Sequence, residues 1–136
     1  MAGTPAGPPY DADADFVEVE LPADGAYLSV LRTATAGLAA RLDFTIDEIE
    51  DLRIAVDEAC AMLLAQVVPD ARLRCRFALA SDSLLVSVSA PTVAGLVPAR
   101  DTFAWTVLSA LTDGVQTSVD EGRTVTIELH KKRDKP

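Results

Sequence analysis

The sequence has 136 residues, a net charge of −9 and an apolar fraction of 49%. This length allows one domain with a buried core, and no apolar run approaches the roughly 20 residues that a membrane-spanning helix needs. The acidic balance argues against direct binding to nucleic acid or to an anionic membrane, since both require basic patches. We therefore expect a cytoplasmic globular domain.

The first 15 residues, MAGTPAGPPYDADAD, contain no basic residue and no apolar run, so we expect no signal peptide. Their content of Pro, Gly, Ala and Asp predicts a flexible tail over 1–15. The patterned sequence that follows predicts a single domain over 16–131. A short basic tail is expected over 132–136.

The first half of the domain predicts a strand followed by two helices. FVEVEL alternates apolar and acidic residues, which predicts a half-buried strand over 16–21. Apolar residues at helical spacing predict a helix over 26–42. TIDE is a capping box in which Thr45 caps the helix and Glu48 reaches back, so a second helix begins there and continues to about residue 66.

The second half predicts a hairpin, a loop, a third helix and a second hairpin. The strands are expected over 72–79, 84–90, 114–119 and 123–130, the loop over 91–99 and the helix over 102–111. This order predicts an α+β fold, a two-layer sandwich of a mostly antiparallel mixed sheet with helices on one face. In the first hairpin, Arg72, Arg74 and Arg76 alternate with apolar residues. They predict either a solvent-exposed strand face whose arginines pair with acidic neighbours, or a surface that recruits an acidic partner.

The metal-ligating residue types predict no metal site. Cys60 and Cys75 lack CxxC spacing and fall in apolar elements, which favours two buried, reduced thiols over a disulfide or a metal site. The lone His130 lies in a basic segment, and we expect it to be solvated.

The stretch RIAVDEACAMLLAQ raises the main question about function. It predicts a helix that is apolar almost all round, yet Asp57 and Glu58 lie in its middle. A carboxylate on a buried helix needs a partner or a chemical role. Asp57 is expected to be a polar edge of the helix, whereas Glu58 fits the buried spacing poorly.

Three stretches resemble the RsbW-type anti-sigma factor serine kinases, which have the GHKL (Bergerat) ATPase fold. They are LDFTIDEIEDLRIAVDEAC, LLVSVSAPTVAG and FAWTVLSALTDGVQTSVDEGRTVTIEL. The resemblance implies a homodimer that holds a sigma factor inactive and releases it to a STAS-type anti-anti-sigma protein. Such partner switching operates in stress responses. Active members also phosphorylate a serine of the antagonist with ATP.

The resemblance carries over residue by residue. Glu58 matches the catalytic glutamate of the N-box, which serves as general base or orients the reacting groups. Met62 stands where the family has an asparagine that holds Mg²⁺, and a thioether is a poor ligand for this ion. Ala90 replaces the aspartate that reads adenine. Thr102, Phe103 and Ala104 occupy the place of a glycine box that cradles phosphate.

These replacements predict a degenerate nucleotide site, so we expect an anti-sigma pseudokinase without a cofactor. The alternative is an active serine-protein kinase that uses Glu58, ATP and Mg²⁺. A third possibility is a scaffold that regulates another partner. Without a nucleotide role, Glu58 would be a vestige or a hydrogen-bonding strut.

Two further positions bear on partners. Arg32 matches an arginine that contacts both the sigma factor and the antagonist in the family, and such arginines are frequent hot spots. It could equally be a solvated surface charge. We expect Phe103 and Trp105 to pack the third helix against the sheet, with a partner groove as the alternative.

Overall fold

The computed structural model describes residues 15–134. Its elements are β1 (Asp15–Pro22), a 3₁₀ turn (Gly25–Tyr27), α1 (Leu28–Arg41), α2 (Ile46–Leu64), β2 (Arg72–Leu79), β3 (Ser83–Pro91), α3 (Phe103–Leu111), β4 (Gly114–Val119) and β5 (Thr124–Lys132). Every predicted element is present. The predicted tail over 1–15 lies outside the described residues, apart from Asp15.

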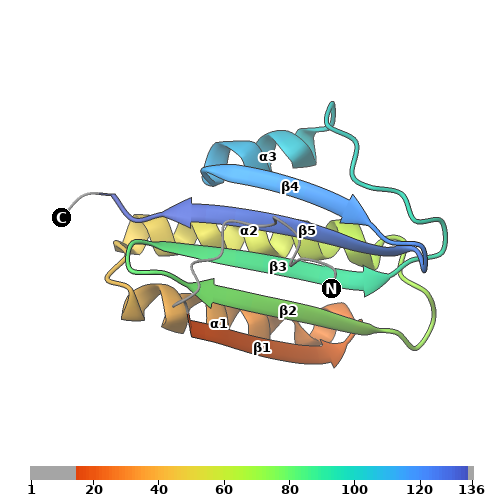
Figure 1. Cartoon of the computed structure of the whole chain (residues 1–136), viewed down its shortest axis with the longest axis horizontal. Helices are drawn as coiled ribbons and strands as arrows, with labels where there is room; N and C mark the ends of the chain where they lie inside the picture. The colour runs from red at the N-terminus through yellow and green to blue at the C-terminus, as the bar shows by residue number, and fades with distance from the viewer. Residues whose placement is uncertain (1–14, 135–136) are drawn as a thin grey trace, which may run out of the picture.

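The strands form one sheet in the order β1-β2-β3-β5-β4, and each neighbouring pair is antiparallel. Helices α1 and α2 lie behind the sheet, and α3 packs beside α2 (Figure 1). The two-layer α+β class predicted from the sequence is confirmed. No helix in the described part of the chain is long and apolar enough to span a membrane.

The core lies between the sheet and the helix layer. Alternate residues of β2 and β3 point into it, so Phe77 and Val86 are fully buried. On α2, residues at helical spacing meet them, among them Leu52, Val56 and Leu63. Full burial of each such side chain contributes about 1.5–3 kcal/mol, which makes α2 the best-anchored helix.

The predicted capping box fixes the start of α2. The Thr45 hydroxyl accepts from the Glu48 N–H at 3.1 Å, and Glu48 Oε1 accepts from the Thr45 N–H at 2.7 Å. Glu48 is buried, and its Oε2 also accepts from the Asp134 N–H at 2.6 Å. Burial acts to raise the pKa of Glu48, but the N–H groups of Thr45 and Asp134 outweigh it and lower the pKa below its ordinary 4.5.

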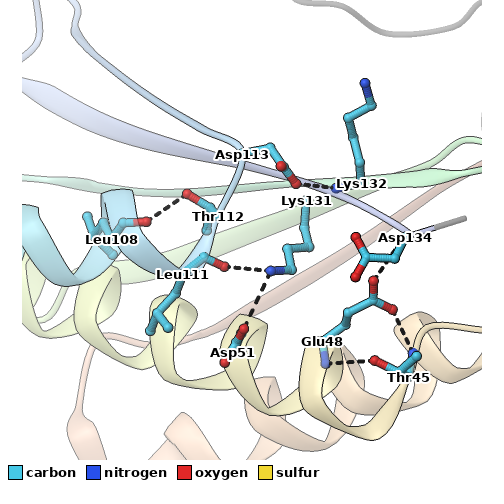
Figure 2. A network of polar contacts seen from close by, with 10 residues as sticks. All are labelled: Thr45, Glu48, Asp51, Leu108, Leu111, Thr112, Asp113, Lys131, Lys132 and Asp134. Carbon is cyan, nitrogen blue, oxygen red and sulfur yellow. Dashed lines mark hydrogen bonds and ion pairs between the residues drawn. The ribbon is translucent and has the colours of Figure 1, made fainter.

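The end of β5 is tied to the helix layer by a polar network (Figure 2). Lys131 Nζ donates to the Leu111 carbonyl at 2.9 Å and lies 3.6 Å from Asp51. Arg133 donates to the Leu42 carbonyl at 2.9 Å. Part of the predicted tail over 132–136 is therefore held against the helices, while residues 135 and 136 lie outside the described part.

Candidate functional site

Two hollows border α2. The first, here called the apolar cleft, measures about 310 Å³ and is lined by Met62, Ala65, Gln66, Leu96, Val97, Pro98, Ala99, Thr102 and Ala104. The second, here called the arginine groove, measures about 430 Å³ and is lined by Arg32, Thr33, Ala36, Gly37 and Arg53. Both volumes suit a small ligand or a few side chains of a partner.

The apolar cleft brings together three of the positions that the sequence identifies as degenerate: Met62, Thr102 and Ala104. Its lining has no charged side chain, so it offers Mg²⁺ no carboxylate and phosphate no cation. Ala90 lies elsewhere, because its side chain is 1% exposed and packs in the core. The residues present do not fit an ordinary Mg-nucleotide site.

Thr102 has a structural role that the sequence interpretation missed. Its hydroxyl accepts from the Trp105 N–H at 3.1 Å and so caps α3. A threonine directly before an apolar helical run is a recognisable N-cap signal. The Thr102 side chain therefore satisfies the N-terminus of α3 itself.

The prediction that Phe103 packs α3 on the sheet is wrong, whereas that for Trp105 is confirmed. Phe103 is 83% exposed and Trp105 is buried in the core cluster. The two residues are two apart, so on a helix they point to different sides. Only the side that carries Trp105 and Leu108 faces the interior.

The loop between β3 and α3 is fixed by side chains of the chain itself. The Gln66 amide donates to the Leu96 carbonyl at 2.6 Å and accepts from the Leu96 N–H at 3.3 Å. Arg123 donates to the Val93 carbonyl at 2.9 Å, from a backbone with φ +66°. These three hydrogen bonds of Gln66 and Arg123, here called the loop clamp, leave Val93 and Leu96 more than half exposed.

Gly95 has a backbone role in the loop between β3 and α3. Its φ is +69°, and an added Cβ would lie 3.2 Å from Arg123. Its N–H donates to the Thr92 hydroxyl at 2.8 Å. Gly95 therefore allows the loop to pass against the clamp.

Glu58 lies one helical turn before Met62 but does not line the apolar cleft. Its side chain is partly exposed and has no hydrogen bond or ion pair within residues 15–134. A strut would require such a bond, so this role has no support. The assignment of Glu58 as a catalytic or vestigial carboxylate stays a prediction.

Asp57 is more than a polar edge of its helix. Arg32 Nε on α1 donates to Asp57 Oδ1 at 2.9 Å and to Oδ2 at 2.8 Å. The two side chains are 41% and 37% exposed, and such pairs add only about 0–1 kcal/mol to stability. The pair fixes the direction of Arg32, and the sequence analysis missed it.

The expected nature of the two thiols is confirmed. Cys60 and Cys75 are buried, and neither forms a disulfide. Burial, with a smaller effect of the Asp57 charge, raises the pKa of Cys60 to about 12. Both thiols are therefore protonated core residues at neutral pH.

The basic face of β2 pairs with β1, as one of the two interpretations predicted. Arg74 lies 3.4 Å from Glu20, and Arg76 lies 3.8 Å from Glu18. Arg76 also covers the Phe16 ring at 4.3 Å. These contacts join the two strands on the sheet face opposite α1 and α2 (Figure 1).

Known proteins of similar sequence are of the RsbW type. The anti-sigma-F factor RsbW of Mycobacterium tuberculosis (strain ATCC 25618 / H37Rv) is 38% identical over 104 residues, which cover 76% of this chain and 62% of that protein. The serine-protein kinase RsbW of Bacillus subtilis (strain 168) is 48% identical over 48 residues, which cover 35% of this chain and 30% of that protein. No family profile matches the sequence.

A solved structure supports the fold. The crystal structure of the RsbU and RsbW domains of a Mycobacterium tuberculosis protein superposes with a TM-score of 0.70 at 17% identity, covering 90% of this chain and 33% of that one. The chain spans less than two thirds of the length of these relatives. The resemblance to RsbW-type proteins predicted from the sequence is confirmed.

Proposed function

We propose that the chain is an anti-sigma factor that sequesters an RNA polymerase sigma factor without binding Mg-ATP, and that a STAS-type antagonist releases it. The similarity to an anti-sigma-F factor supports the sigma-binding part. The observation that carries the nucleotide-free part is the lining of the apolar cleft, which has no charged side chain. A triphosphate and its Mg²⁺ would be buried there without compensation.

The loop clamp supports the same proposal. Gln66 and Arg123 hold the loop, which contributes Leu96 to the lining of the cleft, through bonds of 2.6–3.3 Å within the chain. A loop ordered by its own side chains needs no nucleotide to hold its conformation, so the fold that binds the partner should not depend on nucleotide.

Two measurements test this proposal. Purified chain is mixed with each sigma factor of the source organism and followed by isothermal titration, and the same cell receives Mg-ATP and Mg-ADP. We expect a sigma factor to bind and the nucleotides to give no heat. Micromolar nucleotide binding would overturn the nucleotide-free part, and the absence of any sigma partner would overturn the anti-sigma part.

A second candidate, the active serine-protein kinase, is favoured by Glu58, which is partly exposed and without a hydrogen-bond partner in the described chain. A general base needs such availability. Incubation with labelled ATP and the antagonist distinguishes the two functions. Phosphate transfer by the wild type that is lost in Glu58→Gln would establish the kinase.

The homodimer that the resemblance implies is part of the proposal. Strands β1 and β4 are the two edges of the sheet and each pairs on one side within the described chain. Unpaired strand edges are ready sites of association. Sedimentation equilibrium measures the state directly, and a monomer at micromolar concentration would contradict it.

A further inference from the structure

A third hollow lies at the end of the sheet where β2 begins and β3 ends (Figure 1). It measures about 370 Å³, a volume that suits a small ligand, and is here called the sheet-end hollow. The side chains that give it polar character are Glu20, Asp70, Arg72, Arg74, Ser89 and Thr124. They come from four strands and from the loop before β2, and none of them lines the apolar cleft or the arginine groove.

The sheet-end hollow lies where two neighbouring strands separate. The ladder between β2 and β3 ends at the pair of Arg74 and Ser89, although β1 still pairs with Arg72 and β5 still pairs with Pro91. Beyond Arg74 and Ser89, β2 and β3 therefore no longer pair with each other, and space opens between them. Both residues alternate with buried core residues along their strands, so their side chains face away from the helices.

The four charged side chains of the sheet-end hollow cancel in formal charge, but only two of them pair. Arg74 lies 3.4 Å from Glu20. Arg72 and Asp70 are exposed, and neither side chain has a hydrogen bond or an ion pair within residues 15–134. One cationic and one anionic group are therefore available to a ligand at the same hollow.

Two hydroxyl groups add further donors. Ser89 and Thr124 are partly buried, and neither hydroxyl makes a hydrogen bond to the part of the chain that the structure describes. A carboxylate accepts several hydrogen bonds at once, and guanidinium and hydroxyl groups are suitable donors. Together with Arg72, the two hydroxyls thus offer a carboxylate more than one donor.

Asp70 occupies a position where the backbone conformation favours glycine. The segment 68–71 forms a turn, in which the Ala71 N–H donates to the Val68 carbonyl at 3.3 Å. The φ angle of Asp70 is +60°, a conformation that glycine adopts at the lowest cost and that aspartate tolerates. Because the Asp70 carboxylate has no bond within residues 15–134, the turn alone does not explain the choice of an acidic residue here.

We propose that the sheet-end hollow binds a small zwitterion, a molecule of amino-acid size that carries one carboxylate and one ammonium group. The ligand carboxylate binds Arg72 and the hydroxyls of Ser89 and Thr124. The ammonium group binds Asp70. Charge complementarity favours this class, because a plain anion would meet the carboxylates of Asp70 and Glu20, and a plain cation would meet two arginines. The site goes beyond the proposed function and does not depend on it.

An NMR titration of the whole chain tests the class of ligand. The probes are three zwitterions of increasing charge separation: glycine, 4-aminobutyrate and 6-aminohexanoate. At least one should shift the amide signals of Ser89 and Thr124 with a dissociation constant of about 1 mM, because exposed charges bind weakly. Butyrate, butylamine and inorganic phosphate at equal ionic strength should bind at least about tenfold more weakly. A singly charged probe or phosphate that binds as tightly as the best zwitterion would overturn the proposal, as would the absence of shifts with all three zwitterions.

Two variants assign the ends of the ligand in the same titration. Asp70→Asn keeps a residue that tolerates positive φ, so the melting temperature should stay within about 3 °C, while zwitterion binding should weaken about tenfold and butyrate binding should not weaken. Arg72→Gln should weaken both about tenfold. The matched controls are Asp47→Asn and Arg41→Gln, at exposed positions of α2 and α1, and both should bind as the wild type does. Wild-type affinity for the zwitterion in Asp70→Asn or in Arg72→Gln would contradict the proposed site.

Discussion

The apolar cleft and the arginine groove border the same helix but differ in what they offer. The cleft, at the C-terminal half of α2, has no charged side chain in its lining, and the clamped loop forms one of its walls. The groove, toward the N-terminal half, presents Arg32 and Arg53 with donors that remain available. The comparison teaches that one end of α2 borders a hollow without charged side chains, whereas the other end borders a hollow with two arginines.

The largest expected change in stability tests this difference between the two hollows, and it concerns Ala90. Ala90→Asp restores the residue that reads adenine in the family, but the side chain is 1% exposed in the core. We expect a loss of about 3 kcal/mol of unfolding free energy, because an unpaired carboxylate would be buried. Met62→Asn, at a partly exposed cleft position, should lose only about 1 kcal/mol. Urea denaturation measures both, and equal losses would show that Ala90 faces the cleft.

The next largest effect is on sigma binding and concerns Arg32 in the arginine groove. Arg32→Ala should weaken sigma binding about thirtyfold, since oriented interface arginines are frequent hot spots. The fold should remain, because the half-exposed pair with Asp57 contributes little. Met62→Asn serves as the control and should bind as the wild type does. Surface plasmon resonance gives both affinities. A stronger loss in Met62→Asn would move the binding site to the cleft.

A smaller effect tests the loop clamp. Gln66→Ala removes both bonds to Leu96 and should lower stability by about 1 kcal/mol. Amide exchange at Gly95 and Leu96 should speed up about tenfold, because local opening becomes easier. Gln116→Ala, at an exposed position of β4, is the control. Unchanged exchange in Gln66→Ala would show that the clamp does not order the loop.

A stability effect of similar size concerns the start of α2, the helix that borders both hollows. The pKa of Glu48 is lower in the folded state than its ordinary 4.5. Its ionised form therefore stabilises the fold above about pH 4.5, and this contribution is lost as the pH falls through the folded-state pKa. Glu48→Gln should be about 1 kcal/mol less stable at pH 7, and the difference should shrink toward pH 3. Urea denaturation at pH 7 and pH 3 measures the stability difference, with Glu121→Gln as the control. A difference between Glu48→Gln and the wild type that stays constant between the two pH values would contradict this prediction.

Local sequence chemistry predicted the fold because each signal acts over a few residues. The capping box at Thr45 and Glu48 and the alternation around Phe77 depend only on neighbours in the chain. These features determine where elements begin and which face is buried. The order of the elements then leaves few ways to cover one side of a sheet.

The details of the candidate site depend on packing and were harder to predict. Arg32 and Asp57 are 25 residues apart in sequence, so their contact follows only from how α1 lies against α2. Phe103 carries the same apolar signal as Trp105, and only the direction in which α3 lies decides which one is buried. The open space beside Gly37 likewise follows from how the helices pack, and the glycine alone does not predict it.

The central claim is that this chain binds its partner without a nucleotide. The most direct test is the dissociation constant of the sigma factor complex, measured by titration with and without saturating Mg-ATP. We expect the two constants to agree within about twofold, since the apolar cleft has no charged residue for the nucleotide. A complex that tightens tenfold or more with Mg-ATP would contradict the account.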